Sequence, residues 1–373
     1  MDSAAFPVAV APAAPARTAA RTGAWLVLLG TAVTTVGVSW DIQWHVEVGP
    51  DSFFTLPHLL LYLGSALSGL ASLTMVLLAT SAQRAGRPWP RSAGGPPVRV
   101  LGGAFHAPLG YLVAGAGAAS FLLYGLMDLW WHSIYGFDAV LDTPSHVALF
   151  LSICVTMVGG VVAFAAGGDQ GWARAGILVG VPILILFAPT PFNALDGLPP
   201  AVNPTAVGSV LCAPTLLLMG ALLLRRGGAL GIALVLGAMQ ALLWWFSPWA
   251  AKAYAAAVGL PLREGLVPRA PQLPASVPVL LVAAALVIEA GWWLRGRAGG
   301  TTTPLLLAVG AVSGIVVGAS LSLQLDLASP ARHLPVAQVA APVLLGIPLG
   351  LLAGYLGPRL AAMLRTPIAR EEY

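Results

Sequence analysis

Long runs of apolar residues dominate the pattern along the chain. About ten such runs alternate with short polar segments, and a stretch such as Pro278 to Ile288 is continuously apolar rather than alternating with polar positions. A helix needs about 20 residues to cross the hydrocarbon core of a bilayer, whereas the strands of a membrane barrel alternate with a period of two. The pattern predicts ten transmembrane helices, over residues 24–44, 56–80, 103–131, 144–167, 174–190, 206–224, 228–247, 275–294, 303–325 and 336–357.

The composition agrees with an all-α membrane protein. Of the 373 residues, 58% are hydrophobic and only 9% are charged, against about 25% charged residues in soluble domains. This argues against a soluble dehydrogenase, a nucleic-acid-binding protein or a secreted disulfide scaffold. The net charge of +4, from 18 basic and 14 acidic residues, is no sign of nucleic-acid binding either. The expected partner is therefore the lipid bilayer and not a nucleic acid.

The distribution of basic residues predicts the orientation. If the ten helices alternate in direction, 14 of the 18 basic residues fall on one side, and the other side holds only Lys252, Arg263, Arg269 and Arg332. Cytoplasmic loops are enriched in Lys and Arg. We therefore expect a multi-pass protein of the cell membrane with both termini in the cytoplasm. Residues 1–22, rich in Ala and Pro, are expected to be a disordered cytoplasmic tail.

A pattern of Asp and His residues occurs twice in the first half of the chain. The segment Trp40–His58 reads WDIQWHVEVGPDSFFTLPH, and Met127–His146 reads MDLWWHSIYGFDAVLDTPSH. Together they contain four of the six histidines of the chain. The repetition predicts that residues 23–167 form a duplicated unit of two helix pairs and that residues 168–373 add six further transmembrane helices.

The spacing within each segment is typical of metal ligands. Asp41 and His45 are four residues apart at a helix end, so their side chains lie on one face, and Pro57 suits the first turn of the next helix, which returns His58. Two imidazoles and a carboxylate leave positions open for water, oxygen or substrate, and they suit copper, zinc or non-haem iron(II). The predicted sites, at the outer ends of the first four helices, are Asp41, His45 and His58, and Asp128, His132 and His146.

The residues around the two segments have simpler interpretations. Four tryptophans are expected to be interfacial anchors, namely Trp40, Trp44, Trp130 and Trp131. Three acids are expected to be loop or helix-capping residues, with a hydrogen bond to a ligating His as the alternative: Asp51, Asp138 and Asp142. Glu47 is either a spare ligand or a solvated side chain.

A glycine pattern in the second half predicts close helix packing. Gly310, Gly314 and Gly318 recur every four residues inside an apolar run. Such spacing lets helix backbones approach closely, either within one bundle or between copies or partner membrane subunits.

At the repeated Asp and His residues the chain resembles the copper-site subunit of the copper-containing membrane monooxygenases, the particulate methane and ammonia monooxygenases. That family carries Asp-x3-His-x12-His and then Asn-x3-His-x13-His on neighbouring transmembrane helices. Asp41, His45 and His58 match the first spacing. Asp128, His132 and His146 match the second, with Asp in place of Asn. The resemblance covers residues 24–166.

The resemblance implies copper as the metal and activation of oxygen for hydroxylating a small apolar or ammonia-like substrate. The residues alone leave zinc and iron open, name no catalytic residue, and leave open whether the protein is an enzyme or part of one. Two other functions stay in view. One is the handling or transport of copper or zinc from the periplasmic side, and the other is a structural role in which the metals only hold helices together.

Overall fold

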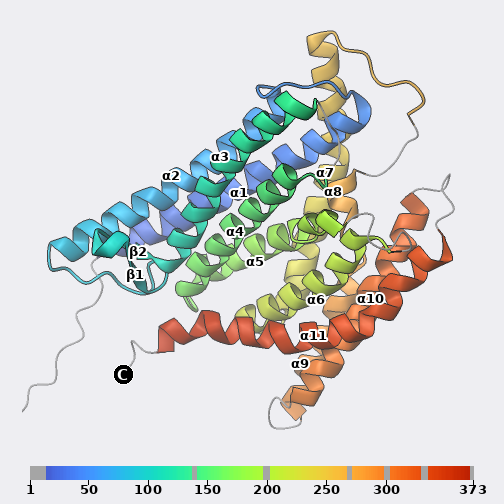
Figure 1. Ribbon diagram of the computed structural model, residues 1–373. Helices are drawn as coiled ribbons and strands as arrows, with labels where there is room; N and C mark the ends of the chain where they lie inside the picture. Colours follow the sequence, from blue (N-terminus) through green and yellow to red (C-terminus); the bar gives the residue numbers. More distant parts are fainter. Residues whose placement is uncertain are drawn as a thin grey trace, which may run out of the picture.

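The computed structural model describes residues 14–136, 141–195, 202–266, 271–297, 303–328 and 335–369, and most of these residues are helical (Figure 1). Nine of the described helices are long and apolar enough to cross a membrane, and the shorter α9 takes the place of the remaining predicted run. The prediction of an all-α polytopic bundle is confirmed. The helices are α1 (Ala14–Glu47), α2 (Leu56–Arg84), α3 (Leu109–Tyr135), α4 (Pro144–Ala166), α5 (Gly171–Phe187), α6 (Pro204–Leu224), α7 (Gly228–Val258), α8 (Gln272–Ala275), α9 (Leu281–Arg297), α10 (Thr303–Ala328) and α11 (Val336–Ala369).

The duplicated half consists of two closely packed helix pairs, α1 with α2 and α3 with α4. Small residues permit the close approach. A Cβ added to Gly30 of α1 would meet the backbone of Gly64 of α2, and one added to Gly159 of α4 would meet the backbone of Ala114 of α3. The two pairs also contact each other, α2 with α3 and α1 with α4. The four helices therefore form one unit, with both repeated segments at the same end of it (Figure 1).

The glycine pattern of the second half packs α10 against α11. Gly310 and Gly314 of α10 face Gly350 and Gly346 of α11 so closely that a Cβ at any of them would meet the opposing backbone. The close packing predicted from the spacing is thus found within the chain. This hairpin packs on α6, which links it to α5 and α7.

Polar side chains form hydrogen bonds between helix termini on the side of the bundle remote from the repeated segments. The Glu289 carboxylate of α9 accepts hydrogen bonds from the backbone N–H groups of Gly227 and Ala229, both at 3.0 Å, at the start of α7. Arg174 of α5 donates to the carbonyl oxygen of Leu224 at the end of α6, at 2.9 Å. A carboxylate at a helix N-terminus and a guanidinium at a C-terminus both satisfy backbone groups that the helix itself leaves unpaired.

Several predicted boundaries are wrong. The tail predicted over residues 1–22 is helical from Ala14 within its described part, and α7 continues past residue 247, through Pro248, to Val258. α3 begins at Leu109 instead of residue 103, because β1 (Pro97–Val100) and β2 (Phe105–Pro108) pair as a short antiparallel hairpin around the 3-10 turn η1 (Leu101–Gly103). A second 3-10 turn, η2, spans Thr190–Leu195.

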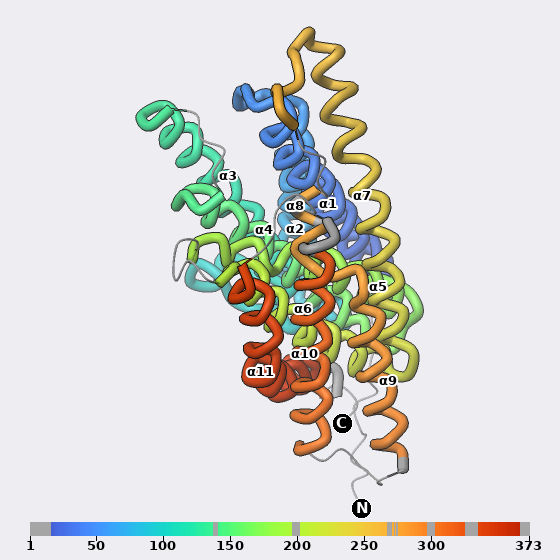
Figure 2. Tube along the Cα trace, turned by 90° about the vertical axis from the view of Figure 1, so that its right-hand side faces the viewer, coloured from blue at the N-terminus to red at the C-terminus, as the bar shows by residue number. Residues whose placement is uncertain are grey.

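α7 extends alongside the end of α1 that carries the first repeated segment. Figure 2 shows the two helix ends next to each other, whereas the end of α3, which carries the second segment, stands apart from α7. The extension beyond residue 247 therefore brings part of the second half of the chain against one of the two repeated segments.

Candidate metal centre

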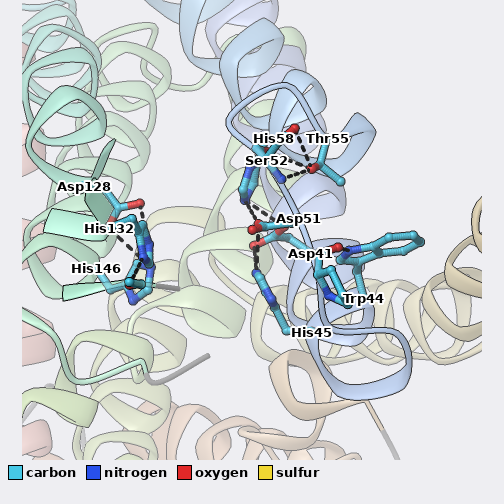
Figure 3. Close-up of polar contacts among 12 residues, drawn as sticks. Asp41, Trp44, His45, Asp51, Ser52, Thr55, His58, Asp128, His132 and His146 are labelled. Atoms are coloured by element: carbon cyan, nitrogen blue, oxygen red, sulfur yellow. Dashed lines mark hydrogen bonds and ion pairs between the residues drawn. The ribbon is translucent and has the colours of Figure 1, made fainter. Parts of the chain in front are cut away.

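The first cluster is built from the end of α1, the following loop and the start of α2. α1 ends in a tight turn in which Val48 N–H and Gly49 N–H both donate to the carbonyl oxygen of Trp44, at 2.8 and 3.0 Å. Gly49 has a φ of +106°, a left-handed value that favours glycine. The chain then reverses, and α2 begins at Leu56 with Pro57 in its first turn. This reversal returns His58 to the face of α1 that carries Asp41 and His45 (Figure 3).

Four side chains converge in this cluster. His58 Nε2 lies 3.0 Å from Asp41 Oδ1 and 3.2 Å from Asp51 Oδ2. His45 Nε2 lies 3.6 Å from Asp41 Oδ2 and 3.4 Å from Asp51 Oδ2. In Figure 3 the two carboxylates lie between the two imidazole rings. One ligand atom from each of the four residues lies within 4.8 Å of all the others.

These separations fit a four-coordinate metal ion. Ligand bonds of about 2.1 Å in a tetrahedral arrangement place neighbouring donor atoms about 3.4 Å apart. The four observed N–O separations, two of which involve different oxygens of Asp41, are 3.0 to 3.6 Å. The carbonyl oxygen of Ser52 lies 2.9 Å from His58 Nδ1. A proton on Nδ1 would satisfy this carbonyl and leave the lone pair of Nε2 facing the cluster, as a metal ligand requires.

Asp51 has the role that the sequence offers as the alternative to capping. Its carboxylate contacts both histidines of the first cluster, whereas the sequence favours a loop or capping residue first. Thr55, not Asp51, accepts a hydrogen bond from the backbone of Ser52, at 2.6 Å, within the turn before α2. Burial raises the pKa of the Asp51 carboxyl group. A bound cation would offset the cost of holding two carboxylates together in a mostly buried place.

The second cluster reproduces three of these positions. His132 Nε2 of α3 and His146 Nε2 of α4 each lie 3.5 Å from one of the two oxygens of Asp128, and the two rings are 5.8 Å apart. The carbonyl oxygen of Gly136 lies 3.2 Å from His132 Nδ1. The structure thus brings together all six predicted residues, as two separate groups (Figure 3).

The other acidic residues considered in the sequence, Asp138, Asp142 and Glu47, do not join the described residues of either cluster. Asp138, the counterpart of Asp51 in the repeat, lies outside the described residues. Asp142 is exposed, and Thr143 takes the capping role at the start of α4, where its hydroxyl oxygen accepts from His146 N–H at 3.4 Å. Glu47 is buried and accepts a hydrogen bond from Gln43 at 2.9 Å, apart from the residues that converge in the first cluster.

Both clusters face one cavity of about 520 Å³. Apolar side chains line the same cavity, among them Leu61, Phe121, Leu149 and Phe150. Tyr62, one helical turn after His58, also lines the cavity, and its ring lies 6.2 Å from the ring of His58 and 6.3 Å from that of Phe121 on α3. Sequence reasoning does not single out Tyr62, although its spacing of four residues from His58 places both on one face of α2.

The tryptophans divide between the two clusters. The prediction that Trp40 and Trp44 lie at the lipid interface is wrong: they are 8% and 1% exposed and pack against α7. Trp130, at 55% exposed, has the surface position expected of an anchor. The extension of α7 explains the difference, since it covers the end of α1.

Comparison with protein-family models, with curated proteins and with solved structures finds no match to this chain. Fold and site alone therefore define its class. Within the part of the chain that the structure describes, it is a multi-pass α-helical membrane protein with two Asp and His clusters, each able to hold a metal ion.

Proposed function

We propose that this protein binds a transition metal at both clusters and uses it to activate oxygen for hydroxylation of a small apolar or ammonia-like molecule. Copper is the metal we favour, on the resemblance of the two spaced motifs to those of the membrane monooxygenases and on the high affinity of copper for nitrogen and oxygen ligands. The observation that carries the proposal is that both clusters, with donor separations suited to a metal, open into the same cavity.

The residues of the cavity have roles that suit such a reaction. Asp41, His45, Asp51 and His58 would hold one ion, and Asp128, His132 and His146 the other. A bound metal would supply the redox chemistry that oxygen activation needs. The apolar wall formed by Leu61, Phe121 and Phe150 would exclude water from the space between the ions and accommodate a small apolar molecule. In a hydroxylation one oxygen atom enters the substrate and the other leaves as water, with electrons and protons drawn from an external reductant.

The proposed orientation places the cavity at the extracytoplasmic face. Asp169 and Arg225, whose side chains form a 2.7 Å ion pair, lie at the end of the bundle remote from the clusters, as does Arg174. The basic residues of the sequence concentrate in the segments at this remote end, which by the positive-inside rule would be cytoplasmic. The clusters would then draw their metal from the outer side.

Metal analysis of the purified protein tests the first part of the proposal. We expect two equivalents of copper in the wild type and one in each of the variants His45→Ala and His132→Ala, with a Cu(II) resonance spectrum that loses a different component in each. His106→Ala is the matched control, because His106 lies in β2, away from both clusters. Retention of both equivalents in the two cluster variants would refute the assignment.

Oxygen consumption tests the second part. We expect the copper-loaded protein, alone or with partner membrane subunits, to consume oxygen when given a reductant together with a short alkane or ammonia, and to form the hydroxylated product. A copper-loaded protein that consumes no oxygen under these conditions would favour the alternative function, in which the protein accepts or transfers metal without oxidising a substrate.

A further inference from the structure

The end of α1 presents two different faces. One carries Asp41 and His45 into the cavity, and the other carries Trp40 and Trp44 against α7. Figure 3 shows the Trp44 ring pointing away from the cluster that its neighbour His45 joins. Metal ligands and packing residues thus share the last two turns of one helix, so a contact that fixes one face also fixes the other.

α7 holds the tryptophan face in place through aromatic contacts. Trp40 meets Tyr254 and Phe246 edge-to-face, each with ring centroids 5.9 Å apart, and Trp44 lies 4.9 Å from Tyr254. Next to the Trp40–Phe246 contact, the buried hydroxyl groups of Ser39 and Ser247 share a hydrogen bond of 2.8 Å. Aromatic pairs of this kind add to the free energy of area burial, so α7 fixes the end of α1.

Trp44 also fixes the turn that carries Asp51. Its indole Nε1–H donates to the carbonyl oxygen of Pro50, at 2.9 Å, directly before Asp51. After α7 the chain returns to the same turn, where the backbone N–H of Arg263 donates to the carbonyl oxygen of Glu47 at 2.8 Å. Both hydrogen bonds act on the segment between the end of α1 and Asp51, and they come from Trp44 and from the second half of the chain.

The second cluster has a different setting. Met127 and Trp131 occupy the positions of the second segment that match Trp40 and Trp44. The ring of Trp131 packs on Tyr135 of its own helix, with ring centroids 4.5 Å apart. The end of α3 stands apart from α7 in Figure 2. α7 lies outside the repeat and packs against the end of α1, next to the turn of the first cluster.

We propose that Trp44, held by Tyr254, is a positioning residue that keeps Asp51 in place as a fourth ligand, so that the first cluster takes up metal before the second and binds it more tightly. The proposal rests on the proposed metal binding. A ligand that is already in place when the ion arrives loses little conformational freedom on binding, which raises affinity. The order in which the two clusters bind metal then depends on the contact of Tyr254 with Trp44. Tyr254 lies on α7, in the half of the chain that carries none of the cluster ligands.

Copper titration of the metal-depleted, full-length protein in detergent tests this proposal. In the wild type we expect two binding constants, with the first equivalent bound at least about tenfold more tightly and giving the spectrum of the first cluster, as assigned by His45→Ala. Trp44→Phe keeps an aromatic ring against Tyr254 but removes the N–H donor. It should weaken the first equivalent about tenfold and shift its Cu(II) spectrum in the same direction as Asp51→Asn.

Trp131→Phe is the matched control at the equivalent position of the second repeat, and it should leave the first equivalent unchanged. If Trp44→Phe alters the yield of folded protein, Tyr254→Leu provides a second test that leaves α1 intact, and it should weaken the same equivalent. A purely structural role would lower thermal stability without moving the Cu(II) spectrum.

Three results separate the possible failures. An unchanged affinity and spectrum in both Trp44→Phe and Tyr254→Leu would overturn the positioning role while leaving the clusters intact. An unchanged spectrum in Asp51→Asn would show that Asp51 is no ligand and overturn the proposal at that step. Binding of copper that is indifferent to His45→Ala and to His132→Ala would instead refute the proposed function.

Discussion

The two clusters share one ligand pattern but not one environment. In the first cluster, α7 covers the helix end and a fourth side chain, Asp51, joins the ligands. In the second, three described residues converge and Trp130 near them is exposed. The comparison teaches that a repeated motif specifies which side chains meet, whereas a helix outside the repeat, α7, gives the two groups different surroundings.

The strongest test of the comparison removes one ring from each cluster. His58→Ala and His146→Ala delete equivalent ligands on α2 and α4. Each should lower the affinity of its own cluster by at least about 100-fold, because outer-shell changes alone cost about 10- to 100-fold in metal sites. Equilibrium dialysis with copper should show one equivalent lost in each variant. Loss of both equivalents in either variant would indicate one shared centre instead of two.

A smaller and unequal effect is expected when the helix carboxylate of each cluster becomes an amide. Asp128→Asn removes the carboxylate that the described part of the second cluster supplies, whereas Asp41→Asn leaves Asp51 in the first. An amide is neutral and attracts a cation less strongly. We expect at least about a tenfold loss of affinity for Asp128→Asn, and a smaller loss for Asp41→Asn. Equal losses in competition titrations would show that Asp51 contributes no charge to the first site.

The sequence predicts most of the fold because the bilayer imposes one solution on long apolar runs. Helices satisfy their own backbone groups within lipid, so each run maps onto one helix. The wrong boundaries lie at helix ends, where contacts within the protein decide whether the helix continues. The apolar pattern places the limit of α7 just before Pro248, yet the helix runs on to Val258 because its extension packs against Trp40 and Trp44 instead of lying in lipid.

Helical periodicity and the internal repeat are enough to predict the Asp and His residues that the two clusters share. Four-residue spacing places Asp41 with His45, and the repeat points to the equivalent residues around Asp128. Periodicity cannot decide between a capping role for Asp51 and a contact with a ligating His, because that contact depends on the path of a loop, which the hydrogen bond from Trp44 to Pro50 and the left-handed Gly49 determine. The sequence does contain one sign that Asp51 belongs to the site, because Asp138 occupies the equivalent position of the second segment. The residues around Asp51 lie in a loop and therefore show no helical spacing.

Metal-dependent stability compares the clusters through the loss of one equivalent ligand from each, His58 in the first and His146 in the second. Copper at about 100 times the dissociation constant should raise the free energy of unfolding by about 2.7 kcal/mol per site. At one equivalent of copper, His146→Ala should keep most of the wild-type rise in apparent melting temperature, because the first cluster fills first. His58→Ala should lose most of it. The opposite ranking would reverse the order of affinities that we propose.

The smallest expected effect tests whether the second cluster depends on its own helix cap. Thr143 begins α4, and its hydroxyl oxygen accepts from the backbone N–H of His146. Replacing a capping Thr with a residue that has no hydroxyl group costs about 1 kcal/mol. Because the neighbouring end of α3 stands apart from α7 (Figure 2), part of this loss should emerge as freedom of the His146 ring. Thr143→Val should weaken copper binding at the second cluster a few-fold and leave the first unchanged, in titrations that resolve the two equivalents.

Thr55→Val is the change at the equivalent position before α2, where the Thr55 hydroxyl group bonds to the backbone of Ser52 and makes no cap hydrogen bond to the helix. Trp44 also restrains the turn there, through its hydrogen bond to Pro50, so the effect of Thr55→Val on the first cluster should be smaller than that of Thr143→Val on the second. A larger loss for Thr55→Val would mean that each cluster is held mainly by its own loop, and the contrast drawn between them would disappear.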